Sequence, residues 1–239
     1  MKKIVDILNK HTQKMKTNLD ETQINLLVEF NKFLQKENSK YNLTAITEPE
    51  DVAIRHFLDS LYLAELESFQ SAYNIIDIGS GAGFPGIPLA IAYPDKKFLL
   101  VDSLRKRVDF LNELTAKLYL NNVKAVHKRA EEIAKEEQFR EQFDFVTARA
   151  VAQLNVLAEY CLPLVKISGV FVAMKLFKNN EEVKEANNAI KILGGKIINN
   201  VSYHLPKDKD YELIIIEKIK NTPKKYPRRP GIPKKRPLI

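Results

Sequence analysis

A glycine-rich turn between an apolar run and a helix-like pattern constrains this chain more than any other feature. The run covers Asn74 to Ile78, and the helix-like pattern begins at Ile87. Four glycines lie between them: Gly79, Gly81, Gly83 and Gly86. Because glycine adopts positive φ and has no Cβ, the main chain of such a turn can come within contact distance of a ribose or a phosphate. The pattern therefore predicts a buried strand, a tight turn and a helix start at a nucleotide-like cofactor.

Two acidic residues mark the ends of neighbouring predicted strands. Asp77 comes just before the turn, where its carboxylate can orient the loop or contact a cationic group of a ligand. Asp102 follows the apolar run Phe98 to Val101, which is typical of a parallel strand buried on both faces. An acidic residue about 20 residues after the turn binds ribose hydroxyls. Asp77, Gly79, Gly81 and Asp102 are therefore candidate cofactor-binding residues.

The glycine pattern alone fits either a nicotinamide dinucleotide or S-adenosylmethionine. Asp77 is unusual where a pyrophosphate must bind, since its charge has the same sign. Phe84 and Pro85 make the predicted helix start bulky, whereas a pyrophosphate prefers open backbone amides there. Both features favour S-adenosylmethionine, and an NAD-dependent oxidoreductase remains the alternative.

The order of the remaining patterns predicts the parallel part of a sheet. Further strand-like runs cover 123–127, 143–146 and 170–174, and helical patterns cover 107–120 and 154–165. Strands and helices that alternate in this way imply parallel pairing with right-handed crossovers.

The last part of the predicted sheet follows a different rule. A helix is expected from about Asn180 to Leu193, followed by strands at Lys196 to Tyr203 and Tyr211 to Glu217. No helical pattern separates these two strands, so they should form an antiparallel hairpin. The whole order predicts an α/β fold of the class I S-adenosylmethionine-dependent methyltransferases, Rossmann-like, with a mostly parallel seven-stranded sheet and a C-terminal antiparallel hairpin.

The sequence divides into three predicted segments. Apolar residues repeat at helical spacing over residues 1–70, which predicts a helical cap over the open edge of the sheet near the donor. One of its helices is expected from Val52 to Leu66, opened by Pro49. Residues 71–219 form the predicted methyltransferase domain. Residues 220–239 form a tail with eight basic side chains, five prolines and no acidic residue, in a chain of net charge +8. Prolines disfavour a regular helix and like charges repel, so the free tail should be extended and should bind phosphate backbone.

Composition indicates a cytoplasmic protein without a membrane segment. The 239 residues are 45% hydrophobic but contain no long apolar run, and polar residues interrupt the first apolar stretch before it could serve as a signal peptide. The single cysteine, Cys161, cannot form an internal disulfide and lies in an apolar helical run, which favours a buried structural thiol. No Cys/His cluster has zinc spacing, so no metal is expected.

Four motifs together resemble one known family. They are Tyr41 to Ala45, His56 to Leu61, Asp77 to Leu89, and Asp102 to Arg107. This combination is similar to that of the GidB (RsmG) family, the bacterial 16S ribosomal RNA guanine-N7 methyltransferases, and the resemblance runs from roughly residue 42 to residue 217. It implies S-adenosylmethionine as the cofactor and 16S ribosomal RNA as the partner. It also implies donor binding at the positions of Gly79, Phe84, the pair Ala130 and Glu131, and Arg149.

The implied chemistry bears on the target-base pocket. Guanine N7 carries a lone pair and no hydrogen, so it can attack the methyl group directly, and alignment rather than a general base is required. Asn42, His56 and Arg149 are the candidate pocket residues, although a structural role for His56 and a surface ion pair for Arg149 remain alternatives. The substrate could be naked RNA, the small ribosomal subunit or its precursor, and a monomer is expected. A non-enzymatic RNA-binding or ribosome assembly protein on the same fold is the second alternative function.

Overall fold

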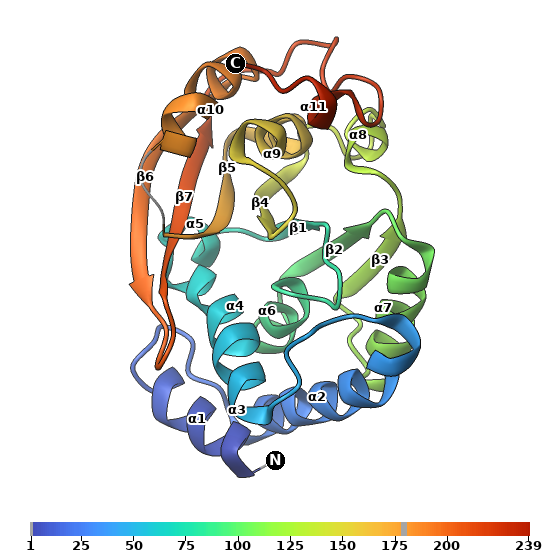
Figure 1. Cartoon of the computed structure of the whole chain (residues 1–239), viewed down its shortest axis with the longest axis vertical. Helices are drawn as coiled ribbons and strands as arrows, with labels where there is room; N and C mark the ends of the chain where they lie inside the picture. Colours follow the sequence, from blue (N-terminus) through green and yellow to red (C-terminus); the bar gives the residue numbers. More distant parts are fainter. Residues whose placement is uncertain (1, 178–180) are drawn as a thin grey trace.

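The computed structural model describes residues 2–177 and 181–239, and its centre is a single seven-stranded sheet with helices on both faces (Figure 1). The strand order is β3-β2-β1-β4-β5-β7-β6. The strands are β1 (Asn74–Ile78), β2 (Lys97–Asp102), β3 (Val123–His127), β4 (Phe143–Arg149), β5 (Val165–Leu176), β6 (Gly195–His204) and β7 (Asp210–Lys218). Strands β1 to β5 pair in parallel, and β7 runs antiparallel to both β5 and β6. The predicted fold class, with its C-terminal hairpin, is confirmed.

The continuous apolar runs of the central strands follow from burial on both faces of the sheet. In β2, Phe98 and Leu100 join one hydrophobic cluster, while Leu99 and Val101 join the cluster on the opposite face. Successive side chains of a strand point to opposite faces, so a strand covered on both sides needs apolar residues at every position. Each such side chain contributes roughly 1.5–3 kcal/mol when fully buried.

The two faces are covered by different helices. One face carries α1 (Lys2–Thr12), α2 (Glu21–Tyr41), α3 (Pro49–Val52), α4 (Asp59–Leu61), α5 (Glu67–Gln70), α6 (Gly86–Ala92) and α7 (Arg105–Lys117). The other carries α8 (Ala130–Ile133), α9 (Leu154–Cys161), α10 (Glu181–Ile192) and α11 (Ile232–Lys235). The expected start of α10 at Asn180 lies outside the described residues.

The N-terminal helices share a hydrophobic cluster with the sheet. Phe30 of α2 and Phe57 belong to the same cluster as Phe98 and Leu100 of β2. Helix α2 begins at a capping box, in which the Asp20 carboxylate accepts the backbone N–H of Gln23. The helical segment is thus packed continuously onto the strands, and its division from the sheet domain at residue 70 stays a prediction.

A π-helical segment, η1 (Ala53–Leu58), interrupts the helix that the sequence predicts over residues 52–66. It connects α3 to α4, and its last turn carries Arg55 and His56. The sequence predicts a regular helix here, and that prediction is wrong in detail. Short π-helical turns are frequent at functional sites, because the wider turn changes the direction of the side chains that it carries.

The C-terminal segment is folded onto the protein body. Residues 220–239 lie beside α9 and α8, and they include the one-turn helix α11 (Figure 1). The expectation of an extended segment without a helix is wrong for two physical reasons. The Arg228 charge is paired with the buried Glu159, and Pro233 occupies the first turn of α11, where a missing N–H is tolerated.

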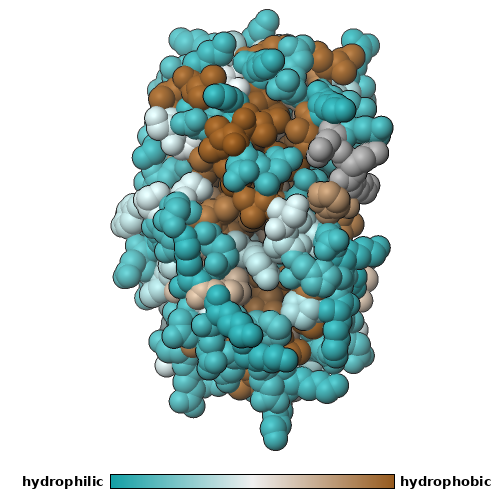
Figure 2. Space-filling view, turned by 90° about the vertical axis from the view of Figure 1, so that its left-hand side faces the viewer, coloured by the Kyte–Doolittle hydropathy of each residue, from teal (hydrophilic) through white to brown (hydrophobic). Residues whose placement is uncertain are grey.

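The edge strand β6 is irregular and partly polar. Its pairing with β7 shifts register between Ile197 and Asn199, where Ile198 is exposed, and the exposed polar residues Lys196, Asn199 and Asn200 flank the shift. Figure 2 shows this side of the molecule, where hydrophilic side chains surround apolar ones gathered in the upper half. A bulge and polar side chains both disfavour pairing of an edge strand with another chain. Among the described residues, no helix has the length and apolar character needed to cross a bilayer.

Candidate functional site

Two cavities lie along the carboxyl edge of the sheet, where ligands bind in open α/β folds. The first, here called the glycine-loop cavity, has a volume of about 290 Å³ and is lined from the ends of β1 and β2 by Ile78, Gly79 and Val101. The second, here called the His56 cavity, has a volume of about 490 Å³ and is lined by His56, Arg149 and Met174 among others. The end of β4 and the segment after it line both: Arg149 and Ala150 face the His56 cavity, and Val151 and Ala152 face the glycine-loop cavity.

Gly79 fits its position for two independent reasons. Its φ of +74° lies in the left-handed region, which L side chains rarely adopt. A Cβ at this position would lie 2.6 Å from Cγ2 of Val151, which also lines the cavity. Any other residue here would therefore strain the turn and clash with Val151.

Asp102 fixes the glycine loop against the start of α7. Its carboxylate accepts the Gly81 N–H at 3.0 Å and the Leu104 N–H at 2.8 Å. Arg107 Nη1 lies 3.4 Å from the same carboxylate. The sequence placed Asp102 at the end of β2 beside the turn, and the structure has it there, nearly buried. Its contact with a ribose stays a prediction.

Asp77 is buried below the glycine loop with one carboxylate oxygen unpaired. Oδ2 accepts the Gly86 N–H at 3.1 Å, and Oδ1 has no hydrogen-bond partner among the residues that the structure describes. Burial, which disfavours the charged form, raises the pKa of Asp77 to about 7. A buried, unpartnered carboxylate beside a glycine cradle fits a ligand that brings a positive charge or hydrogen-bond donors, and S-adenosylmethionine carries both.

Ala130 and Glu131 line the glycine-loop cavity from the first turn of α8. The Glu131 carboxylate is buried and accepts the Gly231 N–H at 2.9 Å. Gly231 and Lys234 of the C-terminal segment also line this cavity. Sequence reasoning assigned the tail to RNA alone, and no signal in the sequence connects these two residues to the glycine turn.

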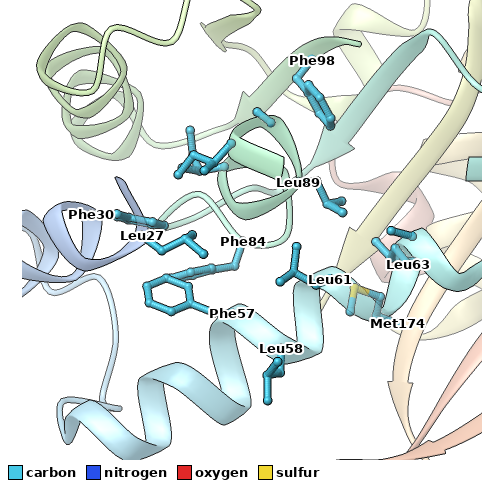
Figure 3. Packing of buried hydrophobic residues seen from close by; sticks show 14 of the residues in the cluster. Leu27, Phe30, Phe57, Leu58, Leu61, Leu63, Phe84, Leu89, Phe98 and Met174 are labelled. Carbon is cyan, nitrogen blue, oxygen red and sulfur yellow. The ribbon is translucent and has the colours of Figure 1, made fainter. Parts of the chain in front are cut away.

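Phe84 points into the hydrophobic cluster, beside Phe57 (Figure 3). Its ring stacks on His56 at a centroid distance of 4.3 Å and on Phe30 at 5.0 Å. The side chain is buried and lines neither cavity. The structure thus makes Phe84 the support of His56, and its contact with a methyl donor stays a prediction.

Arg149 is held in the His56 cavity by three partners. Its Nη1 donates to Asp59 Oδ2 at 2.6 Å and to the Arg55 carbonyl at 3.1 Å, and its guanidinium lies 5.2 Å from the centroid of the Phe84 ring. Asp59 is buried, and its other oxygen accepts the Tyr203 hydroxyl at 2.6 Å. Sequence reasoning did not single out Asp59, although it lies within the motif that begins at His56.

His56 is neutral in this site. Burial, and secondly the charge of Arg149, lowers its pKa to about 3. Nε2 lies 3.0 Å from the Thr44 hydroxyl, and Nδ1 lies 3.2 Å from the Arg55 carbonyl. The imidazole is thus fixed in place by packing and hydrogen bonds.

The structure brings His56 and Arg149 together but leaves Asn42 outside the cavity lining. Asn42 is exposed and ends α2 in the left-handed conformation, with its N–H donating to the Asn38 carbonyl at 2.8 Å. Thr44, two residues later, makes the contact with His56. A target-base role for Asn42 stays a prediction, and its visible role is to cap a helix.

Charged groups surround the His56 cavity in pairs. Lys175 Nζ lies 2.6 Å from Glu182 Oε1, and Lys209 adds a further cation to the lining. Arg55, also in the lining, binds Asp208 at 2.7 Å. Basic groups outnumber acidic ones around this opening, as suits an anionic ligand. Among the described residues, no group of three or more His, Cys, Asp or Glu side chains could hold a metal.

Comparison with known protein families assigns the chain. The family model GidB, described as rRNA small subunit methyltransferase G, matches residues 23–211. The chain belongs to this family. Ribosomal RNA small subunit methyltransferase G of Alkaliphilus metalliredigens is 48% identical over 233 residues, covering 97% of this chain and 98% of the relative. The protein of that name from Clostridium tetani is 45% identical over 237 residues, covering 99% of each. Membership of this family favours the methyl donor over the dinucleotide alternative.

Solved structures agree on the fold. The O-methyltransferase from Bacillus cereus, determined in complex with SAH, superposes with a TM-score of 0.57 at 18% identity, covering 90% of this chain and 100% of that one. An O-methyltransferase family protein from Burkholderia thailandensis gives a TM-score of 0.52 at 12% identity, covering 87% and 76%. At such low identity the likeness concerns the fold alone, and it supports the class I methyltransferase architecture.

Proposed function

We propose that this protein transfers a methyl group from S-adenosylmethionine to N7 of a guanine in 16S ribosomal RNA. The coarser part, methylation of ribosomal RNA with this cofactor, follows from the family. The observation that carries the proposal is the shared wall: the segment Arg149 to Ala152 lines both cavities. A donor in one cavity and a base in the other would both lie against this segment, and in-line transfer requires that the two ligands touch directly at its edge.

The glycine-loop cavity provides the groups that would hold the donor. Gly79 lines the cavity and allows close approach of the backbone, and Ala130 and Glu131 line it from α8. Asp77, Gly81 and Asp102 lie outside the lining, where the unpartnered oxygen of Asp77 and the carboxylate of Asp102 would have to be reached by the bound donor, Asp102 by its ribose. When bound, S-adenosylmethionine supplies an electrophilic methyl group on its sulfonium sulfur.

The His56 cavity provides orientation for the target base. Guanine N7 carries an in-plane lone pair and no hydrogen, so attack in line with the carbon–sulfur bond needs no general base. A neutral His56, stacked on Phe84, agrees with this requirement, because the imidazole can position a base without taking up a proton. Arg149, held by Asp59, brings a fixed positive charge that can bind a phosphate or the donor carboxylate.

The RNA partner is supported by charge. Seven basic side chains of the docked C-terminal segment are exposed: Lys220, Lys224, Lys225, Arg229, Lys234, Lys235 and Arg236. Phosphate backbone is the natural ligand of such a cluster. The small ribosomal subunit or its precursor presents this RNA in the cytoplasm, and the protein acts there as a monomer.

Mapping of modified nucleotides tests this function. Mass mapping of 16S ribosomal RNA from cells with and without the protein should show one N7-methylguanosine that disappears with the protein. Purified protein should restore that methyl group from S-adenosylmethionine, and the variant Arg149→Gln should restore less of it. An unchanged modification pattern in the cells without the protein would contradict the proposal. Binding of NAD in place of the methyl donor in a thermal-shift assay would also contradict it.

A further inference from the structure

The C-terminal segment forms one wall of the glycine-loop cavity. Gly231 and Lys234 lie in the lining with Gly79, Val101 and Ala130, although 100 residues of chain separate Gly231 from Ala130. The Gly231 N–H donates to the Glu131 carboxylate at 2.9 Å. The segment therefore closes the cavity on the α8 side and also fixes the side chain that follows Ala130.

A buried ion pair holds this wall. Arg228 Nε lies 2.9 Å from Glu159 Oε1 and its Nη2 lies 2.6 Å from Oε2, while the Arg228 backbone N–H donates to Oε1 at 2.8 Å. Glu159, on α9, is 0% exposed. A carboxylate buried to this extent is costly unless it is paired, so the arrangement of Arg228 is strongly determined.

Two further contacts fix the start of the segment. Lys218 Nζ, fully buried at the end of β7, donates to the Thr222 hydroxyl at 2.9 Å. Arg140 donates to the Thr222 carbonyl at 2.8 Å and to the Tyr226 carbonyl at 2.9 Å. The wall is thus held at several points, and the Arg228–Glu159 pair lies between Tyr226 and the lining residue Gly231.

We propose that residues 226–235 are a positioning element of the methyl-donor site, held in place by Arg228, and that affinity for the donor depends on this clamp. The inference rests on the proposed function, since it takes the glycine-loop cavity as the donor site. Arg228 acts through Gly231 and Glu131, because Arg228 itself does not line the cavity.

Two adjacent arginines provide a matched test. Arg228 is bound to Glu159, whereas Arg229 is exposed. In the full-length protein, calorimetry with S-adenosylhomocysteine should give a Kd about tenfold higher for Arg228→Gln than for the wild type, the range seen when a supporting residue of a binding site is lost. Arg229→Gln removes the same charge and should leave the Kd within about twofold.

The results of calorimetry distinguish a failure of the positioning role of residues 226–235 from a failure of the proposed function. A wild-type protein that binds no S-adenosylhomocysteine overturns the proposed function, and the wall with it. If the wild-type protein binds S-adenosylhomocysteine and a folded Arg228→Gln variant binds it equally well, only the positioning role of residues 226–235 is refuted.

A measurement on the unaltered protein covers the case in which Arg228→Gln does not fold. Addition of S-adenosylhomocysteine should slow hydrogen exchange of the amides in residues 226–235, including that of Gly231. Exchange that is unchanged by saturating ligand overturns the wall.

Discussion

Burial controls the charge of the two acid–base groups that matter most at the residue scale. Asp77 is buried in an apolar setting and retains its proton to about pH 7, because its pKa is raised. His56 is buried beside a fixed guanidinium and stays neutral, because its pKa is lowered to about 3. The two groups are therefore less charged than they would be in water, His56 in the lining of its cavity and Asp77 beneath the glycine loop.

The first prediction concerns Asp77→Asn in the protein without ligand. Native Asp77 keeps its proton to about pH 7, whereas the unfolded chain releases it near pH 3.9. Its contribution to the free energy of unfolding is thus present below about pH 4 and is lost as the pH rises toward 7. The variant lacks this loss, so its stability relative to the wild type should rise by roughly 2–4 kcal/mol between pH 4.5 and pH 7.5. Urea unfolding of both proteins at pH 4.5 and pH 7.5 measures the change. The same difference in free energy of unfolding between variant and wild type at both pH values would refute the prediction.

The second prediction concerns the protonation of His56. Since its pKa is about 3, its ring nitrogen resonances should not shift between pH 5 and pH 8, whereas free imidazole titrates within that range. Nitrogen-15 NMR of histidine-labelled protein, assigned with His56→Gln, makes the measurement. A titration midpoint near pH 6 would mean that His56 can act as a base, contrary to the proposed mechanism.

Sequence reasoning succeeds for residues whose position follows from chain order and fails for those selected by tertiary contact. Asp77, Gly79 and Asp102 could be found because they end neighbouring parallel strands. Asp59 could not, because its importance arises from Arg149, 90 residues away. The polarity of Asn42 suggests a binding residue, while its backbone conformation gives it the role of a helix cap.

At the element scale, the cavities are shaped by the contact between two connections, the turn after β1 and the segment after β4. Gly79 belongs to the first and Val151 to the second, and a Cβ on Gly79 would lie 2.6 Å from Val151. The space for a ligand therefore depends on the smallest residue at the point where the two connections meet.

The third prediction separates the two effects of a side chain at this point. Gly79→Ala should destabilise the protein by roughly 1–3 kcal/mol and weaken binding of S-adenosylhomocysteine, since it adds both a strained φ and a clash. Gly81→Ala is the control, because Gly81 also has positive φ but its Cβ would meet nothing closer than 3.9 Å. The double variant Gly79→Ala, Val151→Ala should regain the part of the stability and affinity that is lost to the clash with Val151, but not the part lost to the strained φ. Urea unfolding and calorimetry measure both effects, and a double variant no better than Gly79→Ala would show that φ alone matters.

The elements themselves were largely predictable. The strands follow from apolar runs, and α2 follows from helical spacing after a capping sequence at Asp20. The π-helical segment η1 was not predictable, since π and regular turns use the same residues and differ in hydrogen bonding that tertiary packing selects.

At the scale of the whole molecule, charge is distributed unevenly. The C-terminal segment carries exposed cations at the end of the molecule opposite α1 (Figure 1). The sequence predicted this charge but not its location, because an ion pair between Arg228 and Glu159 depends on the folded arrangement of α9. The segment is therefore a fixed basic surface rather than a free tether.

The fourth prediction concerns the salt dependence of RNA binding. Replacing Lys224 and Lys225 by glutamine should reduce the slope of log K against log salt concentration by about 0.7 for each phosphate of single-stranded RNA that the variant no longer neutralises. Replacing the exposed Lys10 and Lys14, at the far end of the molecule, makes the same change in net charge and should leave the slope unaltered. Fluorescence anisotropy with a fragment of 16S ribosomal RNA at several salt concentrations makes the measurement. If both double variants reduced the slope equally relative to the wild type, net charge alone, and not the position of the lysines, would explain the reduction.

The closure of the glycine-loop cavity by Gly231 and Lys234 sets an order of events during biosynthesis. Translation proceeds from the N-terminus, so all seven strands emerge before these two residues do. A nascent chain can thus complete its sheet while the cavity still lacks a wall. If this cavity holds the methyl donor as proposed, a polypeptide released before Arg228 pairs with Glu159 would have the complete sheet but an open pocket.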